Sequence, residues 1–361
     1  MGKGAQSQRP RWEVRATTSF AHPGEVATAS SGQARQPHWP FGARVLVTGA
    51  TGFIGSHLVR RLVADGVEVH GLTSAVSSIY ALRLVELRES IALHEASLVD
   101  RGAMEELVDE VRPSHVLHLG AYTHVGKSWQ RVDECVQANV QGTVNLLQSL
   151  DGSGYSRFVN MGTSEIYGAV SSPFREDALA RPLSPYAASK YAAECFCRVF
   201  HEGRGWPIVM LRPFNAYGPG QTADRVIPEV IVRALRGEEL RMTQGRQTRE
   251  FNYVEDIVDG IVRAATVPGI EGELLNLGCG QDVSIREVTT LILDMLGNPV
   301  AAQFGALPDR PTEIWEMRSD STKAREMLDW KPQHSLTDGL EKTITWYRDE
   351  LSDPASPFIA R

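Results

Sequence analysis

The stretch RVLVTGATGFIGSHLV at residues 44–59 decides the fold. Its apolar run at 45–47 is typical of a short buried strand, and a helical pattern follows from 54 to 64. Between them, three glycines permit a tight turn, the approach of backbone to a diphosphate, and close packing of helix on strand. The helix N-terminus then faces the phosphate charge. The stretch therefore predicts a dinucleotide-binding turn made by Gly49, Gly52, Phe53, Ile54 and Gly55.

Strand, turn and helix keep alternating after this stretch. Such alternation predicts an α/β fold with a Rossmann-type, doubly wound parallel sheet, whose ligands bind at the carboxyl ends of the strands. Beyond residue 213 the elements become shorter and less regular, which indicates a smaller C-terminal α/β lobe with the substrate between the two parts. The predicted strands are 45–47, 67–72, 91–94, 115–119, 158–161 and 208–211, and the predicted helices are 54–64, 101–111, 131–150, 186–201, 226–235, 257–265, 285–296 and 336–347.

Three regions follow from this pattern. Residues 1–41 are rich in Arg, Ser, Pro and Gly without periodicity, so we interpret them as a disordered N-terminal extension, with an organelle transit peptide as the weaker alternative. Residues 42–212 form the predicted dinucleotide-binding domain, which also carries the catalytic residues. Residues 213–361 form the mainly substrate-binding lobe.

Composition argues against several kinds of partner. The 361 residues carry a net charge of −7, which disfavours nucleic acid as a ligand. No apolar run reaches the roughly 18 residues of a membrane span. The four cysteines lack paired metal-ligand spacing, which predicts reduced thiols, no metal site and a cytoplasmic protein. We also expect a homodimer.

The end of the second predicted strand normally selects the cofactor. A carboxylate there binds the adenosine ribose of NAD, whereas arginine binds the 2′-phosphate of NADP. This chain has Thr73 and Ser74 instead, with Arg83 as a nearby candidate for the phosphate. The sequence therefore leaves NAD or NADP open.

Tyr186 and Lys190 begin a predicted helix after Ser184-Pro185. Their spacing puts phenol and ammonium on one helix face. The ammonium is expected to lower the pKa of the phenol from about 10 toward working pH. Such a tyrosine can take the proton of a sugar hydroxyl while hydride leaves for nicotinamide.

Together these motifs resemble the extended short-chain dehydrogenase/reductase family, in particular its nucleotide-sugar epimerases and dehydratases, from about residue 43 to 347. The resemblance implies a cofactor that is tightly bound and regenerated in each turnover, and a nucleotide-diphosphate sugar as substrate. It extends the cofactor contacts to Ser97, Leu98, Leu119, Gly120, Ala121, Tyr186, Lys190 and Pro213. It assigns substrate contacts to His124, Val125, Lys127, Asn215, Val226, Arg249 and Arg310, with the two arginines on the diphosphate. Ser97 stands where the family commonly has an aspartate that contacts adenine.

The stretch VNMGTSEIYG at residues 159–168 bears on the reaction. By the resemblance, Thr163 hydrogen-bonds the sugar C4 oxygen. Epimerases of the family usually carry small residues where this chain has Ser164 and Glu165, whereas the Thr-Ser-Glu pattern is similar to 4,6-dehydratases acting on GDP-mannose and UDP-sugars. Oxidation at C4 acidifies the C5 proton, and a carboxylate can remove it as the C6 hydroxyl leaves. Ser164, or a water it holds, would assist that departure.

We therefore predict a nucleotide-sugar 4,6-dehydratase with Thr163, Ser164, Glu165, Tyr186 and Lys190 as its catalytic residues. A 4-epimerase is one alternative. A UDP-glucuronate decarboxylase is another, because the loop at 168–181 offers two arginines. A cofactor-binding sensor is the non-enzymatic alternative. The identity of the nucleotide and of the sugar stays open.

Overall fold

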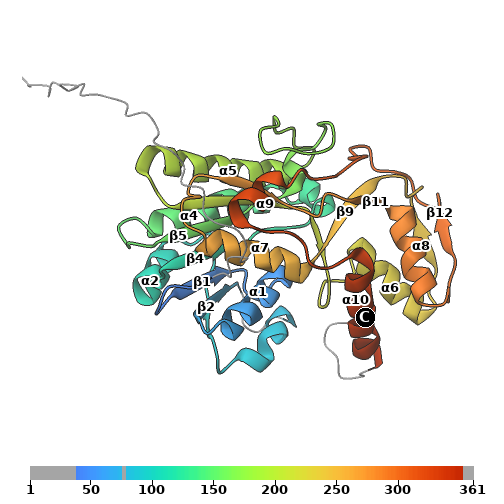
Figure 1. The fold of residues 1–361 in the computed structure, drawn as a ribbon, viewed down its shortest axis with the longest axis horizontal. Coiled ribbons are helices and arrows are strands. Elements are labelled where there is room, and N and C mark those ends of the chain that lie inside the picture. Colours follow the sequence, from blue (N-terminus) through green and yellow to red (C-terminus); the bar gives the residue numbers. More distant parts are fainter. Residues whose placement is uncertain (1–37, 75–78, 353–361) are drawn as a thin grey trace, which may run out of the picture. The chain divides into compact units, whose positions relative to one another are not determined.

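The computed structural model describes residues 38–74 and 79–352, so the predicted extension lies almost wholly outside the described residues. The centre is a seven-stranded sheet in the order β10-β6-β5-β4-β1-β2-β3 (Figure 1). All its neighbouring strands are parallel. The strand order reverses beside β1, which confirms the doubly wound α/β fold. The strands are β1 (Arg44–Thr48), β2 (Glu68–Thr73), β3 (Ala92–Glu95), β4 (His115–His118), β5 (Arg157–Met161), β6 (Ile208–Pro213) and β10 (Leu274–Leu277).

Helices cover both faces of this sheet because the buried strands carry apolar residues on alternating sides. Val45 and Val47 share a core with α1 (Phe53–Ala64), α7 (Val254–Thr266) and α9 (Thr322–Leu328). Leu46 points the other way, into a core with α2 (Arg101–Val111), α4 (Gly142–Ser149) and α5 (Pro185–Arg204). Strand β10 and helix α7 come from beyond residue 212, so the second half of the chain also builds the sheet.

The helix predicted at 131–150 is divided. It consists of α3 (Val132–Cys135), a wider π-helical segment η3 (Val136–Gln141), and α4. The wider turn carries Asn139, whose amide bonds both the backbone N–H and the carbonyl of Tyr122 and also donates to the hydroxyl of Ser189 on α5. The interruption thus ties the segment after β4 to helix α5. Short 3₁₀ segments stand at η1 (Ile79–Leu87), η2 (Gly126–Gln130) and η4 (Ser164–Ile166).

The second lobe is built around its own apolar core. A three-stranded sheet has the order β11-β9-β7, and a two-stranded sheet pairs β12 with β8. Helices α6, α8 and α10 pack with these strands, as seen at the right of Figure 1. The bounds are β7 (Asn215–Tyr217), α6 (Val226–Arg236), β8 (Leu240–Met242), β9 (Thr248–Tyr253), β11 (Asp282–Ser284), α8 (Ile285–Met295), β12 (Ala302–Phe304) and α10 (Leu336–Ser352).

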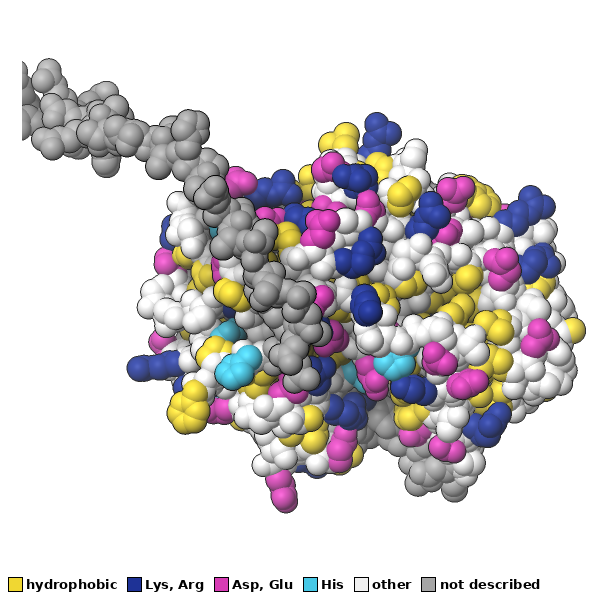
Figure 2. All heavy atoms as spheres, in the orientation of Figure 1, with side chains coloured by type: hydrophobic (Ala, Val, Ile, Leu, Met, Phe, Trp, Pro, Cys, Tyr) yellow, Lys and Arg dark blue, Asp and Glu magenta, His cyan; other side chains and the backbone are white. Residues whose placement is uncertain are grey.

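Acidic and basic side chains are interspersed over the face drawn in Figure 2. Within residues 38–74 and 79–352, no helix combines the length and the apolar character needed to cross a membrane. The four cysteines are free thiols, two buried and two partly buried.

Candidate functional site

The turn after β1 leaves no room for side chains at its glycines. Gly49 has a φ of +67°, and a Cβ there would lie 2.9 Å from the backbone of Gly120. A Cβ on Gly55 would lie 2.1 Å from the carbonyl oxygen of Gly49. Gly52 is the N-cap of α1 and makes no side-chain cap, so the first N–H groups of that helix remain available. Phe53 and Ile54 open the helix. The shape of this close-packed turn is compatible with a diphosphate at a helix N-terminus, and the role of these glycines in cofactor binding stays a prediction.

The residues after β2 and β3 offer hydroxyls and backbone. The hydroxyl of Thr73 lies 3.0 Å from that of Thr51 in the glycine turn, and Ser74 is exposed beside it. Ser97 is exposed and Leu98 half-buried after β3. Arg83 is buried, and its guanidinium donates to the carbonyl oxygens of Thr51 and Gly220. The structure therefore does not support Arg83 as a binder of the 2′-phosphate, because its guanidinium is already hydrogen-bonded to these backbone carbonyls.

The end of β4 is held against the glycine turn by a buried polar chain. The backbone N–H of Gly120 donates to Thr48 Oγ1 at 2.9 Å, with Leu119 and Ala121 on either side. His118 bonds Thr48 through Nδ1 and Thr143 through Nε2. Burial, helped by the Lys190 ammonium, lowers the pKa of His118 to about 3, so the imidazole is neutral. The predicted strand-end segment at 119–121 is thus fixed beside Gly49.

Tyr186 and Lys190 lie on the first turns of α5, both buried. The hydroxyl of Ser184 caps the helix by accepting from the N–H of Ala187. Burial raises the pKa of Tyr186 to about 12, opposed by a hydrogen bond with Thr163. Burial lowers the pKa of Lys190 to about 8. The predicted lowering of the tyrosine pKa by the lysine is therefore not seen: desolvation dominates, and the ionisable neighbours that act on the phenol are Glu165, Arg225 and Cys135.

Thr163, Ser164 and Glu165 lie in the segment that follows β5. Thr163 caps the short helix η4, and its Oγ1 accepts from the N–H of Glu165 at 3.3 Å. Glu165 is partly exposed, whereas Ser164 is buried with its hydroxyl directed at Met317 Sδ, 3.6 Å away. Tyr186 is close enough to both Thr163 and Glu165 for each to change its pKa. The structure thus brings together the carboxylate and the phenol that the sequence singled out.

Arginines from three separate segments act electrostatically on Glu165. Burial raises the pKa of this carboxyl, and Arg249, Arg310 and Arg225 oppose that shift in this order. Arg249, on β9, donates to the carbonyl of Ile314 at 2.6 Å and forms an ion pair with Glu313. Arg310 is exposed, three residues before Glu313. A dianionic group would therefore find two predicted cations close to the candidate base.

The other predicted substrate contacts come from the start of β7, the start of α6 and the segment before η2. Asn215 donates to the carbonyl of Glu250 and to Met317 Sδ. Val226 begins α6 directly after Arg225, whose guanidinium donates to the carbonyl of Thr123. His124 lies 3.4 Å from Asp224 and accepts from the N–H of Lys127, so Val125 and Lys127 stand beside the same helix start. Pro213 is the last residue of β6 and lies two residues before Asn215 in the sequence.

Several residues of the site escaped the sequence analysis. Arg225 acts on Glu165, Tyr186 and His124, but a single arginine before a helix carries no motif. Glu313 gave no sequence signal either, although it lies three residues after Arg310. Met317 contacts both Ser164 and Asn215, and an isolated methionine gives no sequence signal.

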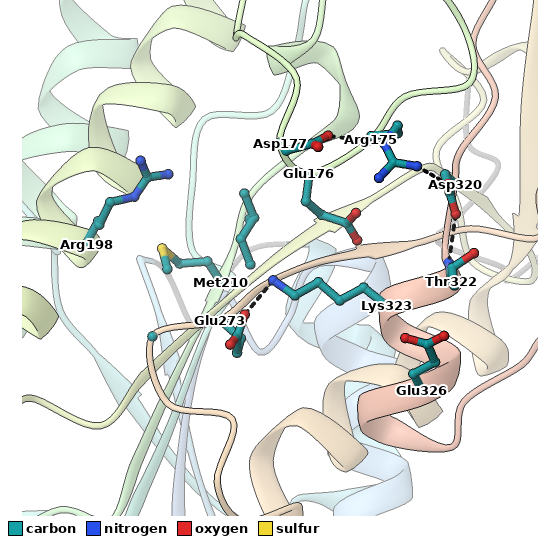
Figure 3. A pocket seen from close by; sticks show the side chains of 12 residues that line it. Arg175, Glu176, Asp177, Arg198, Met210, Glu273, Asp320, Thr322, Lys323 and Glu326 are labelled. Carbon is teal, nitrogen blue, oxygen red and sulfur yellow. Dashed lines mark hydrogen bonds and ion pairs between the residues drawn. The ribbon is translucent and has the colours of Figure 1, made fainter. Parts of the chain in front are cut away.

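A groove of about 540 Å³ lies away from these residues, beside strand β10 (Figure 3). Its lining includes Glu176, Arg198, Glu273 and Lys323, and none of the lining residues is a predicted site residue. Lys323 and Glu273 form an ion pair in it. The groove is thus a separate feature from the predicted site.

Comparisons with known proteins show which enzymes this chain is similar to. A family model described as GDP-mannose 4,6 dehydratase matches residues 46–343. A UDP-glucose 4-epimerase of Mycolicibacterium smegmatis is 35% identical over 317 residues, covering 85% of this chain and 99% of that protein. A probable dTDP-glucose 4,6-dehydratase of Sinorhizobium fredii is 33% identical, covering 84% of this chain and 92% of that protein.

Solved structures give the same two kinds of enzyme. A dTDP-glucose 4,6-dehydratase from Streptomyces venezuelae, with NAD bound, has a TM-score of 0.78 and 31% identity, covering 85% of this chain and 97% of that one. A UDP-glucuronic acid 4-epimerase from Bacillus cereus, in complex with UDP-glucuronic acid and NAD, has a TM-score of 0.79 and 30% identity, covering 84% and 99%.

Proposed function

The chain belongs to the GDP-mannose 4,6-dehydratase family of extended short-chain dehydrogenase/reductases, and on that premise we propose that it is a nucleotide-diphosphate-sugar 4,6-dehydratase. The family makes it a nicotinamide-dependent enzyme that acts on nucleotide sugars as a dehydratase or an epimerase. The observation that carries the finer proposal is the carboxylate of Glu165, which lies beside Tyr186 and among the arginines expected to hold the diphosphate.

The proposed cofactor is NAD, since the solved relatives of both kinds contain it. Gly49, Gly52 and Gly55 would receive its diphosphate, and Gly120 would lie against the same turn. Once bound, the nicotinamide accepts hydride from the sugar and later returns it. Every other task in the reaction falls to side chains of this chain.

Tyr186, as the phenolate, is the proposed acceptor of the proton from the C4 hydroxyl, because its phenol lies beside the Thr163 hydroxyl that would also meet that oxygen. Loss of this proton and of hydride turns C4 into a ketone. The positive charges of Lys190 and of the bound nicotinamide would offset the burial that raises the pKa of this phenol. The same burial that raises the pKa of Tyr186 excludes water from the transfer. Lys190, buried one helical turn away, would orient the cofactor and keep positive charge near the phenol.

Glu165 is the proposed base at C5. The C4 ketone acidifies the C5 proton, Glu165 takes it, and the C6 hydroxyl leaves with one proton as water; the proton that Tyr186 took from the C4 hydroxyl balances the one lost in that water. Hydride then adds to C6, and a proton that has exchanged with solvent on Glu165 adds to C5, so a 4-keto-6-deoxy sugar forms and the cofactor ends as it began. A carboxyl whose pKa is raised by burial is a stronger base for this step than an exposed one.

Ser164 has a smaller part in this proposal. Its hydroxyl is directed at Met317 in the structure, so assistance at C6 would require it to rotate or to act through a water. The second candidate function is 4-epimerase, favoured by the relative from Mycolicibacterium smegmatis. An epimerase reduces the C4 ketone again without loss of water, and Glu165 would then have no chemical step to perform.

A homodimer remains part of the proposal. Trp129 and Val132 are exposed at the start of the α3 region, and Phe196 and Val199 are exposed on α5, which packs against α3. Exposed apolar side chains on two packed helices are typical of a protein–protein interface. Sedimentation of a Phe196→Glu, Val199→Glu double variant should show monomers if these helices form the contact. A cytoplasmic location also stays a prediction.

The decisive experiment for the function is a panel of nucleotide sugars. UDP-, dTDP-, GDP- and CDP-hexoses are incubated with the purified enzyme and NAD, and the masses of the products are measured by mass spectrometry. We expect one of them to lose the mass of a water. Conversion of a sugar without any loss of water would make epimerase the correct assignment.

A further inference from the structure

Arg212, near the end of β6, is buried and surrounded by groups from two other elements. Its Nε and Nη2 donate to the two carboxylate oxygens of Glu194 on α5, at 2.9 and 2.7 Å. The side chains of this pair are 2% and 1% exposed. The same guanidinium stacks on the ring of Tyr167, 4.5 Å from its centroid. Arg212 therefore touches helix α5 on one side and the segment after β5 on the other.

Both contacts lead to proposed catalytic groups. Tyr167 follows Glu165 by two residues and closes the short helix η4. Glu194 lies on the same helix as Tyr186 and Lys190, at successive spacings of four residues, so the three share one face of α5. The guanidinium thus contacts both the Glu165 segment, through Tyr167, and this face of α5, through Glu194.

The hydroxyl of Tyr167 is held by a second group of residues. It donates to Asn276 Oδ1 at 2.7 Å, and Asn276 in turn donates to the carbonyls of Phe174 and Asp320. The backbone N–H of Asn276 donates to Glu176, which lines the groove of Figure 3. The ring of Tyr167 is therefore fixed between Asn276 and Arg212, with little freedom to move.

A buried ion pair is an expensive way to stabilise a core, because two charges lose their hydration. Apolar side chains of similar volume would pack there at no such cost. What an arginine–carboxylate pair supplies is direction, since the planar fork fixes both partners in angle as well as in distance. We propose that Arg212 is a positioning residue that sets the Glu165 segment in register with the helix of Tyr186. This rests on the proposed function, in which both groups act on one sugar ring.

The expected consequence is specific to one step. The helix of Tyr186 is also held by its packing on the sheet, whereas the short segment at 163–168 has Tyr167 as its largest buried side chain. A displacement of about 1 Å in a reacting group can slow a step roughly 100-fold. Loosening Arg212 should therefore slow proton removal at C5 more than oxidation at C4.

The test variant is Arg212→Lys, which keeps the positive charge but loses the fork and the stacking on Tyr167. The matched control is Arg198→Ala, because Arg198 pairs with the same carboxylate at 3.6 Å from an exposed position. A second variant, Tyr167→Leu, removes the stacked ring and leaves the ion pair in place, so the test does not depend on the folding of a single protein.

The first readout is amide hydrogen exchange by mass spectrometry, without substrate. Arg212→Lys and Tyr167→Leu should speed exchange in a peptide covering 162–168 by about 10-fold or more and leave a peptide covering 186–194 unchanged, whereas Arg198→Ala should change neither. Equal exchange at 162–168 in wild type and both variants would overturn the proposal.

The second readout is the ratio of solvent deuterium incorporated at C5 to cofactor reduced in a single turnover. The ratio should fall about 10-fold in Arg212→Lys and stay constant in Arg198→Ala. A variant that only loses stability lowers both quantities together, and that result would contradict a positioning role. If the wild type itself incorporates no deuterium at C5, the dehydratase proposal has failed, and the exchange at 162–168 still decides the role of Arg212.

Discussion

The two sides of the strand-end site are built in different ways. On the cofactor side, Gly49, Gly55 and Gly120 bring backbone against backbone, and a single added Cβ would meet an atom at 2.9 Å or less. On the substrate side, long charged side chains face one another, with Arg249 paired to Glu313 and three arginines acting on Glu165. The first side is fixed by steric exclusion, the second by a balance of charges.

This difference teaches what each side can tolerate. A close-packed turn fails as soon as volume is added, because neither backbone can move. A set of charges can exchange partners, so a bound diphosphate would compete with Glu313 for Arg249, and the loss of one arginine leaves the others. Substitutions on the two sides should therefore differ in size as well as in kind.

The largest effect is expected at the glycine turn. Gly49→Ala combines a left-handed backbone with a Cβ 2.9 Å from Gly120, whereas Gly66→Ala has the same kind of backbone, with φ +74°, and no atom within 4 Å. Backbone strain of this kind costs about 1–3 kcal/mol in either variant. Only at Gly49 does the added Cβ also crowd the turn that would hold the diphosphate, so Gly49→Ala should weaken NAD binding roughly 100-fold. Calorimetric titration of NAD into both variants measures this. Equal affinities would show that crowding at the turn does not matter.

A smaller effect is expected on the substrate side. A charge-assisted bond is worth roughly 1.5–3 kcal/mol, so Arg249→Met and Arg310→Met should each weaken binding of a nucleoside diphosphate about 10-fold or more. Arg241→Met is the control, because Arg241 is exposed and its guanidinium donates to the carbonyl of Ala306. Titrations with UDP, dTDP and GDP would also rank the bases. Unchanged binding in both arginine variants removes them from the site.

The smallest effect concerns pH. Glu165 acts as a base only when ionised, and burial raises its pKa above the ordinary 4.5. Exchange at C5 should therefore be lost as pH falls through this raised value, at a higher pH than an exposed glutamate would give. Arg249 opposes the shift, so Arg249→Met should move the acid limb to a higher pH. If the acid limb of the pH profile stays at the wild-type pH in this variant, Arg249 does not act on the Glu165 carboxyl.

The fold could be predicted from the sequence more fully than the arrangement of the site. Glycines at 49, 52 and 55 carry their reason in their spacing, and the doubly wound parallel sheet followed from the alternation of elements. The pairing of Arg249 with Glu313 could not be foreseen, because β9 and the segment at 310–317 meet only through the tertiary fold. The Tyr186 pKa was misjudged for a similar reason: spacing shows the lysine but not the burial that dominates.

The central claim is that Glu165 removes the C5 proton, and Glu165→Gln in D₂O tests it most directly. Glutamine keeps the size and much of the hydrogen bonding but cannot accept the proton. We predict that wild-type enzyme places deuterium at C5 of a dehydrated product. Glu165→Gln should still reduce its cofactor through Tyr186, yet lose water at least about 100-fold more slowly. Tyr186→Phe should lose both steps. Dehydration by Glu165→Gln at the wild-type rate, with deuterium still entering at C5, would contradict the account.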